Sequence, residues 1–412
     1  MKLYKKAAIT VLITAIVLGL SACGKTTAGN NTDAESTPAA TKTVTPEATE
    51  TPTPTPETAP SEKTFLPTTE FVRTLGRTMA AKDSLWLVHS GTGMEFSVTG
   101  TSVTIKIKPD SSFMTRSNQA RIAIYVNGER VVDDMVDKME KSYTVFESAV
   151  PEECTVRVVK LSEAAYSTIG ITSIEATCIG DIRPTGESDK LIEFIGDSIT
   201  CGYGVDDLDS SHHFSTTTED ATKTYAYKTA EKLGAEYSLV SLSGYGIISG
   251  YSGDGQKKAE QIIPKYYDKM GNSGGTYLGD FVAQERTWNF EKQPDAVVIN
   301  LGTNDASYVK NDAAKKEEYT VAYVAFLKQV REKNPEAVVF CTLGIMGADL
   351  YPCVEDAVNR YVQETGDAKV HTMKFANQNA ADGIAADWHP SEKTHEKAAE
   401  KLAEKMKEIM GW

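Results

Sequence analysis

The hydrophobic pattern of the chain changes its period near residues 183–186, and this change constrains the fold more than any other feature. Between residues 65 and 182, short runs such as 103–107 alternate apolar and polar residues, which is typical of strands with one buried face. After residue 186, continuous β-branched runs such as 296–301 alternate with stretches of helical period. Continuous runs of that kind are typical of parallel strands buried on both faces. The pattern therefore predicts two domains of different class.

The first domain, residues 64–183, is predicted to be a β-sandwich of the jelly-roll type. Several short strands follow one another with little helical pattern, as in sandwiches. Asn127 and Gly128 separate two of these runs and form a strong signal for a tight hairpin. This domain could bind sugar or wall off a cleft. We favour the second role, because the strand-like runs hold few aromatic residues arranged as a platform for sugar.

The second domain, residues 188–412, is predicted to be a three-layer α/β/α domain with a mainly parallel sheet. Strands and helices alternate along it, as they do where helices cover both faces of such a sheet. One helix is expected to bury a row of apolar residues spaced three apart: Val321, Val324, Leu327 and Val330. The last helix is expected to begin near Ser391.

The residues before the first domain have the features of an export signal. Three lysines among the first six residues precede an apolar run of about 14 residues, which is shorter than a membrane span of roughly 20. Small residues and Cys23 follow, so residues 1–23 resemble a bacterial lipoprotein signal peptide in which Cys23 is lipidated. An ordinary signal peptide with a cysteine nearby by chance is the alternative.

Residues 24–63 are rich in Thr-Pro repeats and hold almost no large apolar residue. Such a segment cannot bury enough surface to order itself, so we expect an extended, disordered tether. The protein is therefore predicted to lie on the extracellular face of the cell membrane and to touch the membrane only through the lipid on Cys23.

Charge and cysteine content narrow the choice of partners. The chain has 57 acidic and 43 basic residues and a formal net charge of -14, and no basic patch predicts a nucleic-acid partner. The five cysteines after Cys23 match no zinc-site spacing, and a disulfide between Cys154 and Cys178 is left open. No metal cluster, phosphate loop or cofactor motif is found, so we expect neither a metal nor a cofactor.

Four short motifs follow predicted strands of the second domain. In chain order they are Gly-Asp-Ser at 196–198, Ser-Gly-Tyr-Gly at 243–246, Gly-Thr-Asn-Asp at 302–305 and Asp-Trp-His-Pro at 387–390. Open α/β sheets bind their ligands at the edge where strands end. Each motif alone also fits a structural role, since Gly-Asp-Ser is a common turn and Asn-Asp is a good helix cap. Their combination is therefore what indicates a catalytic site.

The residue types suit the hydrolysis of an ester. A serine at a tight turn just past a strand can present its hydroxyl and its own backbone N–H, which fits Ser198. Gly244 lets backbone donors approach a ligand closely, and the Asn304 amide can donate to a developing oxyanion. His389 is held by a following proline at a helix entrance, which suits a general base.

In this order the motifs resemble the SGNH (GDSL-like) hydrolase superfamily. A β-sandwich ahead of such a domain, with Trp388 immediately before His389, is similar to carbohydrate esterase family 2. Members of that family are carboxylic ester hydrolases that remove acetyl groups from plant cell-wall polysaccharides. The resemblance implies that Ser198 is the nucleophile and His389 its base, and that an acyl-enzyme is hydrolysed by water. It also implies an oxyanion hole formed by the Ser198 and Gly244 backbone N–H groups with the Asn304 amide.

The triad aspartate of the superfamily is missing from its usual place. That place is three residues before the histidine, where this chain has Ala386. Asp387 lies two residues before it, where an extended backbone points the side chain differently. We therefore expect a Ser-His dyad oriented by a backbone carbonyl, with Asp387 as the weaker candidate. Trp388, Tyr203 and Tyr245 are expected to line the cleft and contact sugar.

Two other functions fit the same residues. The chain could hydrolyse another extracellular ester, such as an acetyl group of the cell's own wall polymers or a lipid ester. It could also be a non-catalytic, carbohydrate-binding lipoprotein with a decayed hydrolase domain. The presence of all the reactive residues argues against decay.

Overall fold

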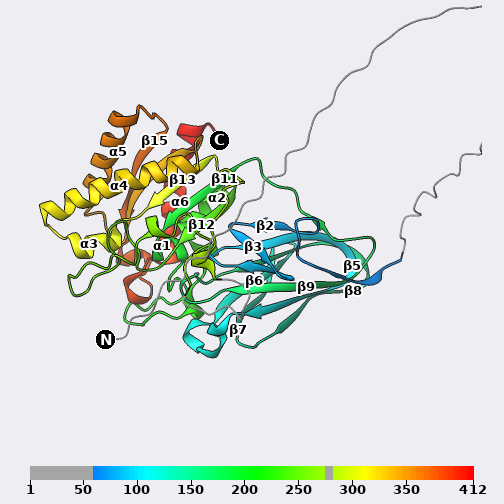
Figure 1. Cartoon of the computed structure of the whole chain (residues 1–412). Helices are drawn as coiled ribbons and strands as arrows, with labels where there is room; N and C mark the ends of the chain where they lie inside the picture. Colours follow the sequence, from blue (N-terminus) through cyan, green and yellow to red (C-terminus); the bar gives the residue numbers. More distant parts are fainter. Residues whose placement is uncertain (1–58, 274–281) are drawn as a thin grey trace, which may run out of the picture. The chain divides into compact units, whose positions relative to one another are not determined.

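The computed structural model describes residues 59–273 and 282–412. These residues form an antiparallel N-terminal domain followed by a C-terminal α/β domain (Figure 1). The predicted signal peptide, Cys23 and most of the predicted tether lie outside the described residues. No described helix is both long enough and apolar enough to cross a bilayer.

The N-terminal domain consists of antiparallel strands that pair into one hydrogen-bonded network of ten strands. In chain order these are β1 (Ser61–Phe65), β2 (Arg73–Leu75), β3 (Thr78–Ala81), β4 (Ser84–Leu87), β5 (Gly93–Pro109), β6 (Ala120–Val126), β7 (Glu129–Val136), β8 (Lys141–Lys160), β9 (Ile169–Cys178) and β10 (Arg183–Pro184). Strand β5 pairs with β8 on one side and β9 on the other. A β-sandwich is defined by two sheets packed face to face, whereas pairing joins all ten described strands of this domain into one network. The β-sandwich and its jelly-roll topology therefore stay predictions.

Side-chain alternation along β5 explains how this sheet buries its core. Val103, Ile105 and Ile107 are fully buried, whereas Thr104 and Lys106 between them are partly exposed. Successive side chains of a strand point to opposite faces, so the sequence pattern sets which face is buried. At the β6–β7 turn, Asn127 and Gly128 have φ values of 51° and 84°, as the predicted tight hairpin requires.

Strand β1 corrects the predicted end of the tether. It starts at Ser61 and pairs with β9, so residues 61–63 belong to the fold. Of its side chains only Phe65 is buried. Backbone pairing rather than burial orders the start of this strand, and such pairing leaves little trace in composition. The sequence left a disulfide between Cys154 and Cys178 open. In the structure Cys154 is a buried free thiol, so this disulfide is not formed.

The C-terminal domain is built on a parallel sheet with the strand order β12-β11-β13-β14-β15. The strands are β11 (Leu191–Gly196), β12 (Glu236–Ser241), β13 (Ala296–Asn300), β14 (Val338–Ile345) and β15 (Val370–Asn377). This confirms the predicted parallel sheet. The chain turns back across β11 between β12 and β13, and the crevice at such a switch point is where open α/β sheets bind ligands.

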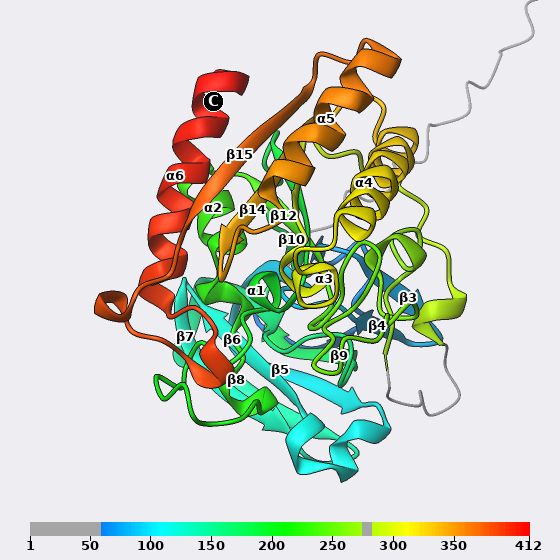
Figure 2. The ribbon, with the colours of Figure 1, turned by 90° about the vertical axis from the view of Figure 1, so that its left-hand side faces the viewer.

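Helices cover both faces of the sheet, which confirms three layers (Figure 2). Helices α2 (Tyr225–Leu233) and α6 (Glu392–Met410) lie on one face, and α4 (Ala313–Lys333) and α5 (Tyr351–Thr365) lie on the other. Alternate residues of β13 divide between the two cores: Val298 packs with the first pair of helices, and Val297 and Ile299 pack with the second. Ser391 caps α6 by accepting a hydrogen bond from the Thr394 N–H, as predicted.

The predicted buried face of α4 is wrong in one position. Val321 is 55% exposed, whereas Tyr323, Leu327 and Val330 are buried. A row spaced three residues apart falls about 60° short of a full turn at each step, so it winds around the helix. Val321 and Val330 therefore lie on opposite faces.

Candidate active site

The structure brings Ser198 and His389 together, although 191 positions separate them in the sequence. Ser198 is the first residue of the short helix α1 (Ser198–Cys201), separated by one residue from the end of strand β11. Asp197 caps this helix by accepting a hydrogen bond from the Ile199 N–H. His389 lies just before α6. Its Nε2 is 2.9 Å from the Ser198 Oγ, so the two side chains share a hydrogen bond.

Backbone carbonyls orient the imidazole of His389. Its Nδ1 lies 3.2 Å from the Ala386 carbonyl oxygen and 3.1 Å from the Asp387 carbonyl oxygen. Because carbonyl oxygens only accept, Nδ1 carries the proton and Nε2 is left to accept the proton of Ser198. Asp387 and Trp388 have φ values of 49° and 64°, a left-handed turn that non-glycine residues seldom adopt. This turn presents the two carbonyls to Nδ1, in agreement with the predicted dyad.

The carboxylate of Asp387 is engaged elsewhere. It accepts hydrogen bonds from the Tyr203 hydroxyl at 2.8 Å, the Phe214 N–H at 2.9 Å and the His213 Nδ1 at 2.9 Å. Partial burial raises the pKa of Asp387, but the hydrogen bonds from His213 and Tyr203 outweigh it and hold the pKa below its ordinary value. The structure thus places the backbone of Asp387, and not its side chain, at the histidine.

Tyr203 supports the histidine rather than lining the cleft as expected. Its ring stacks on His389 with centroids 3.9 Å apart and on Phe214 with centroids 4.3 Å apart. Its hydroxyl donates to Asp387. The ring and the hydroxyl are therefore both occupied by the loop that carries the base.

The environment keeps the histidine in its basic form. Burial lowers the pKa of His389 to about 4, and the hydrogen bonds to the Asp387 and Ala386 carbonyls oppose this only in part. The imidazole is therefore neutral near pH 7, as a general base must be.

Three candidate oxyanion donors belong to segments next to Ser198 in the fold: its own backbone N–H, the Gly244 N–H and the Asn304 amide. Among the described residues, the backbone N–H groups of Ser198 and Gly244 have no partner. The Asn304 Nδ2, at the start of α3 (Thr303–Val309), lies 2.9 Å from the Tyr245 carbonyl oxygen and 3.2 Å from the Asp197 Oδ2. Asn304 is thereby tied to the neighbours of both backbone donors. The two free backbone N–H groups can donate to an oxyanion, and the Asn304 amide can do so by exchanging one of its two contacts.

Asp305 fixes the loop that follows Gly244, a role that the sequence analysis missed. Its carboxylate accepts hydrogen bonds from the N–H groups of Ile247, Ile248 and Ser249. A Cβ on Gly246 would stand 2.4 Å from the Asp305 Oδ2, so only glycine fits there. The aspartate that ends the Gly-Thr-Asn-Asp motif was the available signal for this role.

The two remaining aromatic candidates differ in exposure. Tyr245 is only 9% exposed and accepts a hydrogen bond from the Asn272 Nδ2 at 2.7 Å, so it is a core residue and not the predicted sugar contact. Trp388 is 67% exposed and directly precedes His389. Its indole is available to a ligand at the site. Tyr251, which the sequence analysis did not single out, is 63% exposed and is bonded through its N–H to the Gly244 carbonyl oxygen.

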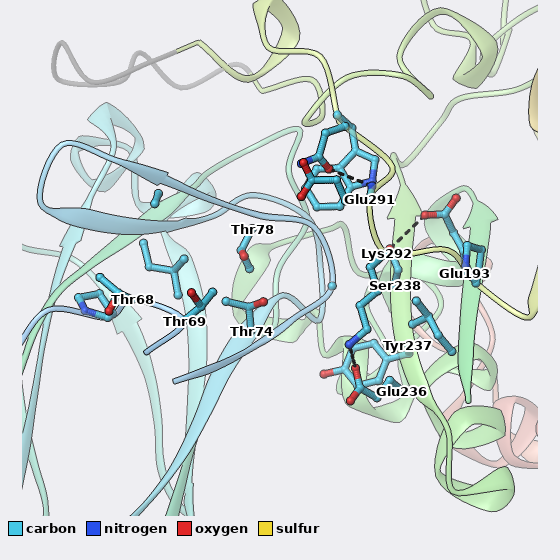
Figure 3. A pocket seen from close by; sticks show the side chains of 18 residues that line it. Thr68, Thr69, Thr74, Thr78, Glu193, Glu236, Tyr237, Ser238, Glu291 and Lys292 are labelled. Atoms are coloured by element: carbon cyan, nitrogen blue, oxygen red, sulfur yellow. Dashed lines mark hydrogen bonds and ion pairs between the residues drawn. The ribbon is translucent and has the colours of Figure 1, made fainter. Parts of the chain in front are cut away.

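A cavity of about 370 Å³ lies away from this site (Figure 3). It is lined by residues of both domains near the first residues of β11 and β12, at the opposite ends of these strands from Ser198. Among its charged side chains, Lys292 pairs with Glu236 at 2.8 Å and Glu193 pairs with Arg77 at 3.0 Å. Neither Ser198 nor His389 lines it.

Both domains match known families. Residues 194–397 match the GDSL-like Lipase/Acylhydrolase family, and residues 74–185 match the Carbohydrate esterase 2 N-terminal family.

Individual relatives agree with these matches. The cellulase/esterase CelE of Acetivibrio thermocellus is 34% identical over 54% of this chain, which spans only 26% of that protein's length. An acetylxylan esterase / glucomannan deacetylase of Cellvibrio japonicus is 23% identical over 85% of this chain and 92% of its own. The solved acetyl xylan esterase of the rumen bacterium Butyrivibrio proteoclasticus superposes with a TM-score of 0.75 at 25% identity, over 84% of this chain and 97% of that one.

Proposed function

The chain belongs to carbohydrate esterase family 2, and we propose that it is a serine esterase that removes O-acetyl groups from plant cell-wall polysaccharides of the xylan or glucomannan type. The observation that carries the chemistry is the 2.9 Å contact between the Ser198 Oγ and the His389 Nε2. The acetylxylan esterases from Cellvibrio japonicus and Butyrivibrio proteoclasticus support the substrate class.

The first half of the reaction forms an acetyl-enzyme. The Ser198 Oγ attacks the acetyl carbonyl while the His389 Nε2 accepts its proton. The negative charge that develops on the carbonyl oxygen is held by the backbone N–H groups of Ser198 and Gly244 and by the Asn304 amide. When the carbon–oxygen bond to the sugar breaks, His389 returns the proton to the sugar hydroxyl that leaves.

The second half releases acetate. Water attacks the acetyl-Ser198 carbonyl and His389 again accepts a proton, which it then returns to the Ser198 oxygen. During both steps the imidazole becomes positively charged. The Ala386 and Asp387 carbonyl dipoles at Nδ1 stabilise this charge in place of a carboxylate.

Several features of the proposal concern recognition and location. The exposed indole of Trp388 offers an apolar face on which a sugar ring can stack. The sequence of residues 1–23 supports a lipid anchor on Cys23, and residues 24–63 support a tether that holds the enzyme at the extracellular face of the membrane. We also infer a jelly roll for the N-terminal domain from its family match.

The test is hydrolysis of 4-nitrophenyl acetate, butyrate and octanoate, followed by acetate release from acetylated xylan and glucomannan. The Ser198→Ala variant of the same protein is the control. We expect strong activity on acetate, steep loss with longer chains, and a drop in kcat of about 10⁴-fold or more in the variant. No hydrolysis of any ester, or equal activity in the variant, would refute the proposal and favour a non-catalytic carbohydrate-binding protein.

A further inference from the structure

Three buried side chains close to the catalytic pair take no part in the chemistry described above. They are Glu163 in the connection between β8 and β9, Cys201 on α1 and Glu219 ahead of α2. All three are fully buried, and their oxygen and sulfur atoms lie within 4.8 Å of one another. Glu163 comes from the N-terminal domain, and the other two come from the C-terminal domain.

One oxygen of Glu163 contacts both segments that carry the proposed backbone donors. Its Oε2 accepts a hydrogen bond of 2.8 Å from the N–H of Ser243, the residue directly before Gly244. The Cys201 Sγ lies 3.8 Å from the same oxygen, and Cys201 ends the short helix that begins at Ser198. A single carboxylate thus connects the nucleophile turn with the loop of Gly244.

The backbone of Glu163 is itself held from both domains. Its N–H donates to the Glu219 Oε2 at 2.9 Å, and its carbonyl oxygen accepts from the Lys160 Nζ at 3.0 Å. Farther along the same connection, the Thr168 N–H donates to Asp110 at 2.8 Å. Because both ends of the connection are fixed, the carboxylate of Glu163 has a defined position.

The cluster contains its own cation. Lys160 is fully buried and its charge is attracted to Glu219, Asp110 and Glu163. Burial raises the pKa of both Glu163 and Glu219, and Lys160 opposes this for each. A protonated Glu163 still offers an oxygen to the Ser243 N–H. The contact with the Ser243 N–H is therefore kept whether or not Glu163 is ionised.

We propose that Glu163 is a positioning residue of the oxyanion hole, through which the N-terminal domain fixes the Gly244 N–H relative to Ser198. The inference rests on the proposed esterase function. Oxyanion donors act only when they are held where the charge develops, and a displacement of about 1 Å costs roughly 100-fold in rate. The N-terminal domain thereby has a part in catalysis that does not depend on sugar binding.

The decisive experiment compares Glu163→Gln with Glu163→Met in the full chain. Both variants remove the charge and keep a side chain of similar length, but only glutamine keeps an oxygen for the Ser243 N–H. With 4-nitrophenyl acetate we expect Glu163→Met to lower kcat by about 30-fold with KM within about threefold, and Glu163→Gln to stay within about threefold of wild type. The affinity for a boronic acid that forms a tetrahedral adduct with Ser198 should fall in parallel with kcat/KM.

The matched control is Glu236→Met. Glu236 is also a buried carboxylate that contacts the N-terminal domain, through Arg73 at 2.9 Å, but it lies at the first residue of β12, at the other end from Ser243. It should destabilise the protein without changing kcat by more than about twofold per folded molecule. An equal loss of kcat in this control would show a general effect of domain contacts and would overturn the proposal.

Other outcomes are equally decisive. A folded Glu163→Met with kcat within threefold of wild type, or equal losses for methionine and glutamine, would refute the role of the acceptor oxygen. If Glu163→Met does not fold, Glu163→Asp replaces it, because its shorter side chain withdraws the acceptor. A loss of about 10-fold in kcat is then expected, and an unchanged kcat refutes the proposal. A wild-type protein that hydrolyses no ester would refute the proposed function instead.

Discussion

Buried carboxylates connect the two domains near both ends of strand β12, and they are satisfied to different degrees. Near the first residue of β12, Glu193 accepts hydrogen bonds from Arg77, Tyr267 and Ser238, and Glu236 pairs with Arg73 and Lys292. Beyond the last residue of β12, Glu163 and Glu219 each keep one oxygen, Oε1, without a partner among the described residues.

This difference predicts which substitutions change the stability of the protein and which change its catalytic rate. A buried charge whose partners are all present holds two surfaces together, and breaking it costs stability. A buried polar atom left without a partner calls for an explanation, and the Oε1 of Glu163 belongs to a carboxylate that contacts the loop of Gly244. Substitutions at the carboxyl ends of the strands should therefore change the rate, whereas substitutions at the amino ends should change stability.

Among the substitutions that test this comparison, Asn304→Ala is expected to have the largest effect on kcat. Loss of one oxyanion donor should lower kcat by about 10² to 10³-fold with little change in KM. Steady-state hydrolysis of 4-nitrophenyl acetate measures this. The matched control is Asn334→Ala, which removes a buried amide that donates to Tyr267 near the other end of the sheet. The control should lower the free energy of unfolding and leave kcat within about twofold.

A smaller effect is expected from Asp387→Asn. Backbone carbonyls already orient His389, and asparagine keeps an oxygen for the Tyr203 hydroxyl, so kcat should fall by less than about 10-fold. A triad acid would instead lose about 10⁴-fold when changed to asparagine. A loss of a thousandfold or more in kcat would therefore contradict the dyad and show that the carboxylate acts on the imidazole.

The pH profile should show a smaller change still. Because the neutral imidazole is the base and burial holds the pKa of His389 near 4, kcat/KM should change by less than about twofold between pH 7 and pH 5.5. A histidine with an ordinary pKa near 6.5 would lose about nine tenths of its neutral form over that range. Burial raises the pKa of Asp197 to about 7. When Asp197 takes up a proton, a negative charge beside Asn304 is removed. The loss of this charge does not disfavour the oxyanion. An acidic limb centred near 6.5 would contradict a His389 pKa near 4.

The sequence predicts the parallel α/β sheet and the proximity of Ser198 and His389, because both depend on local sequence signals. Strand-like runs end in short motifs, and parallel strands bring those motifs to one edge. Ser198, Asn304 and the carbonyl-oriented His389 are all placed together as expected. Glu163 could not be found in this way, since its contact joins positions 80 residues apart in two domains.

Aromatic residues next to the motifs gave weaker predictions. Tyr203 and Tyr245 were expected in the cleft, but one stacks on the imidazole and the other is buried in the core. An aromatic ring beside a catalytic turn can serve packing or binding equally well, and sequence position alone does not distinguish the two. The exposed fraction of the side chain does, and it singles out Trp388 at 67%.

The smallest effect on rate, together with a large effect on stability, is expected from Arg77→Met. The Arg77 guanidinium is 1% exposed, pairs with Glu193 at 3.0 Å and donates to the Tyr267 carbonyl oxygen at 2.6 Å. Methionine leaves Glu193 buried without its cation, which should lower the free energy of unfolding by about 3 to 5 kcal/mol. Adding Glu193→Gln should recover part of this loss, because the uncompensated charge is then removed. Since both residues lie toward the amino ends of the strands, kcat per folded molecule should stay within about twofold, and a tenfold loss would show that the two ends are coupled.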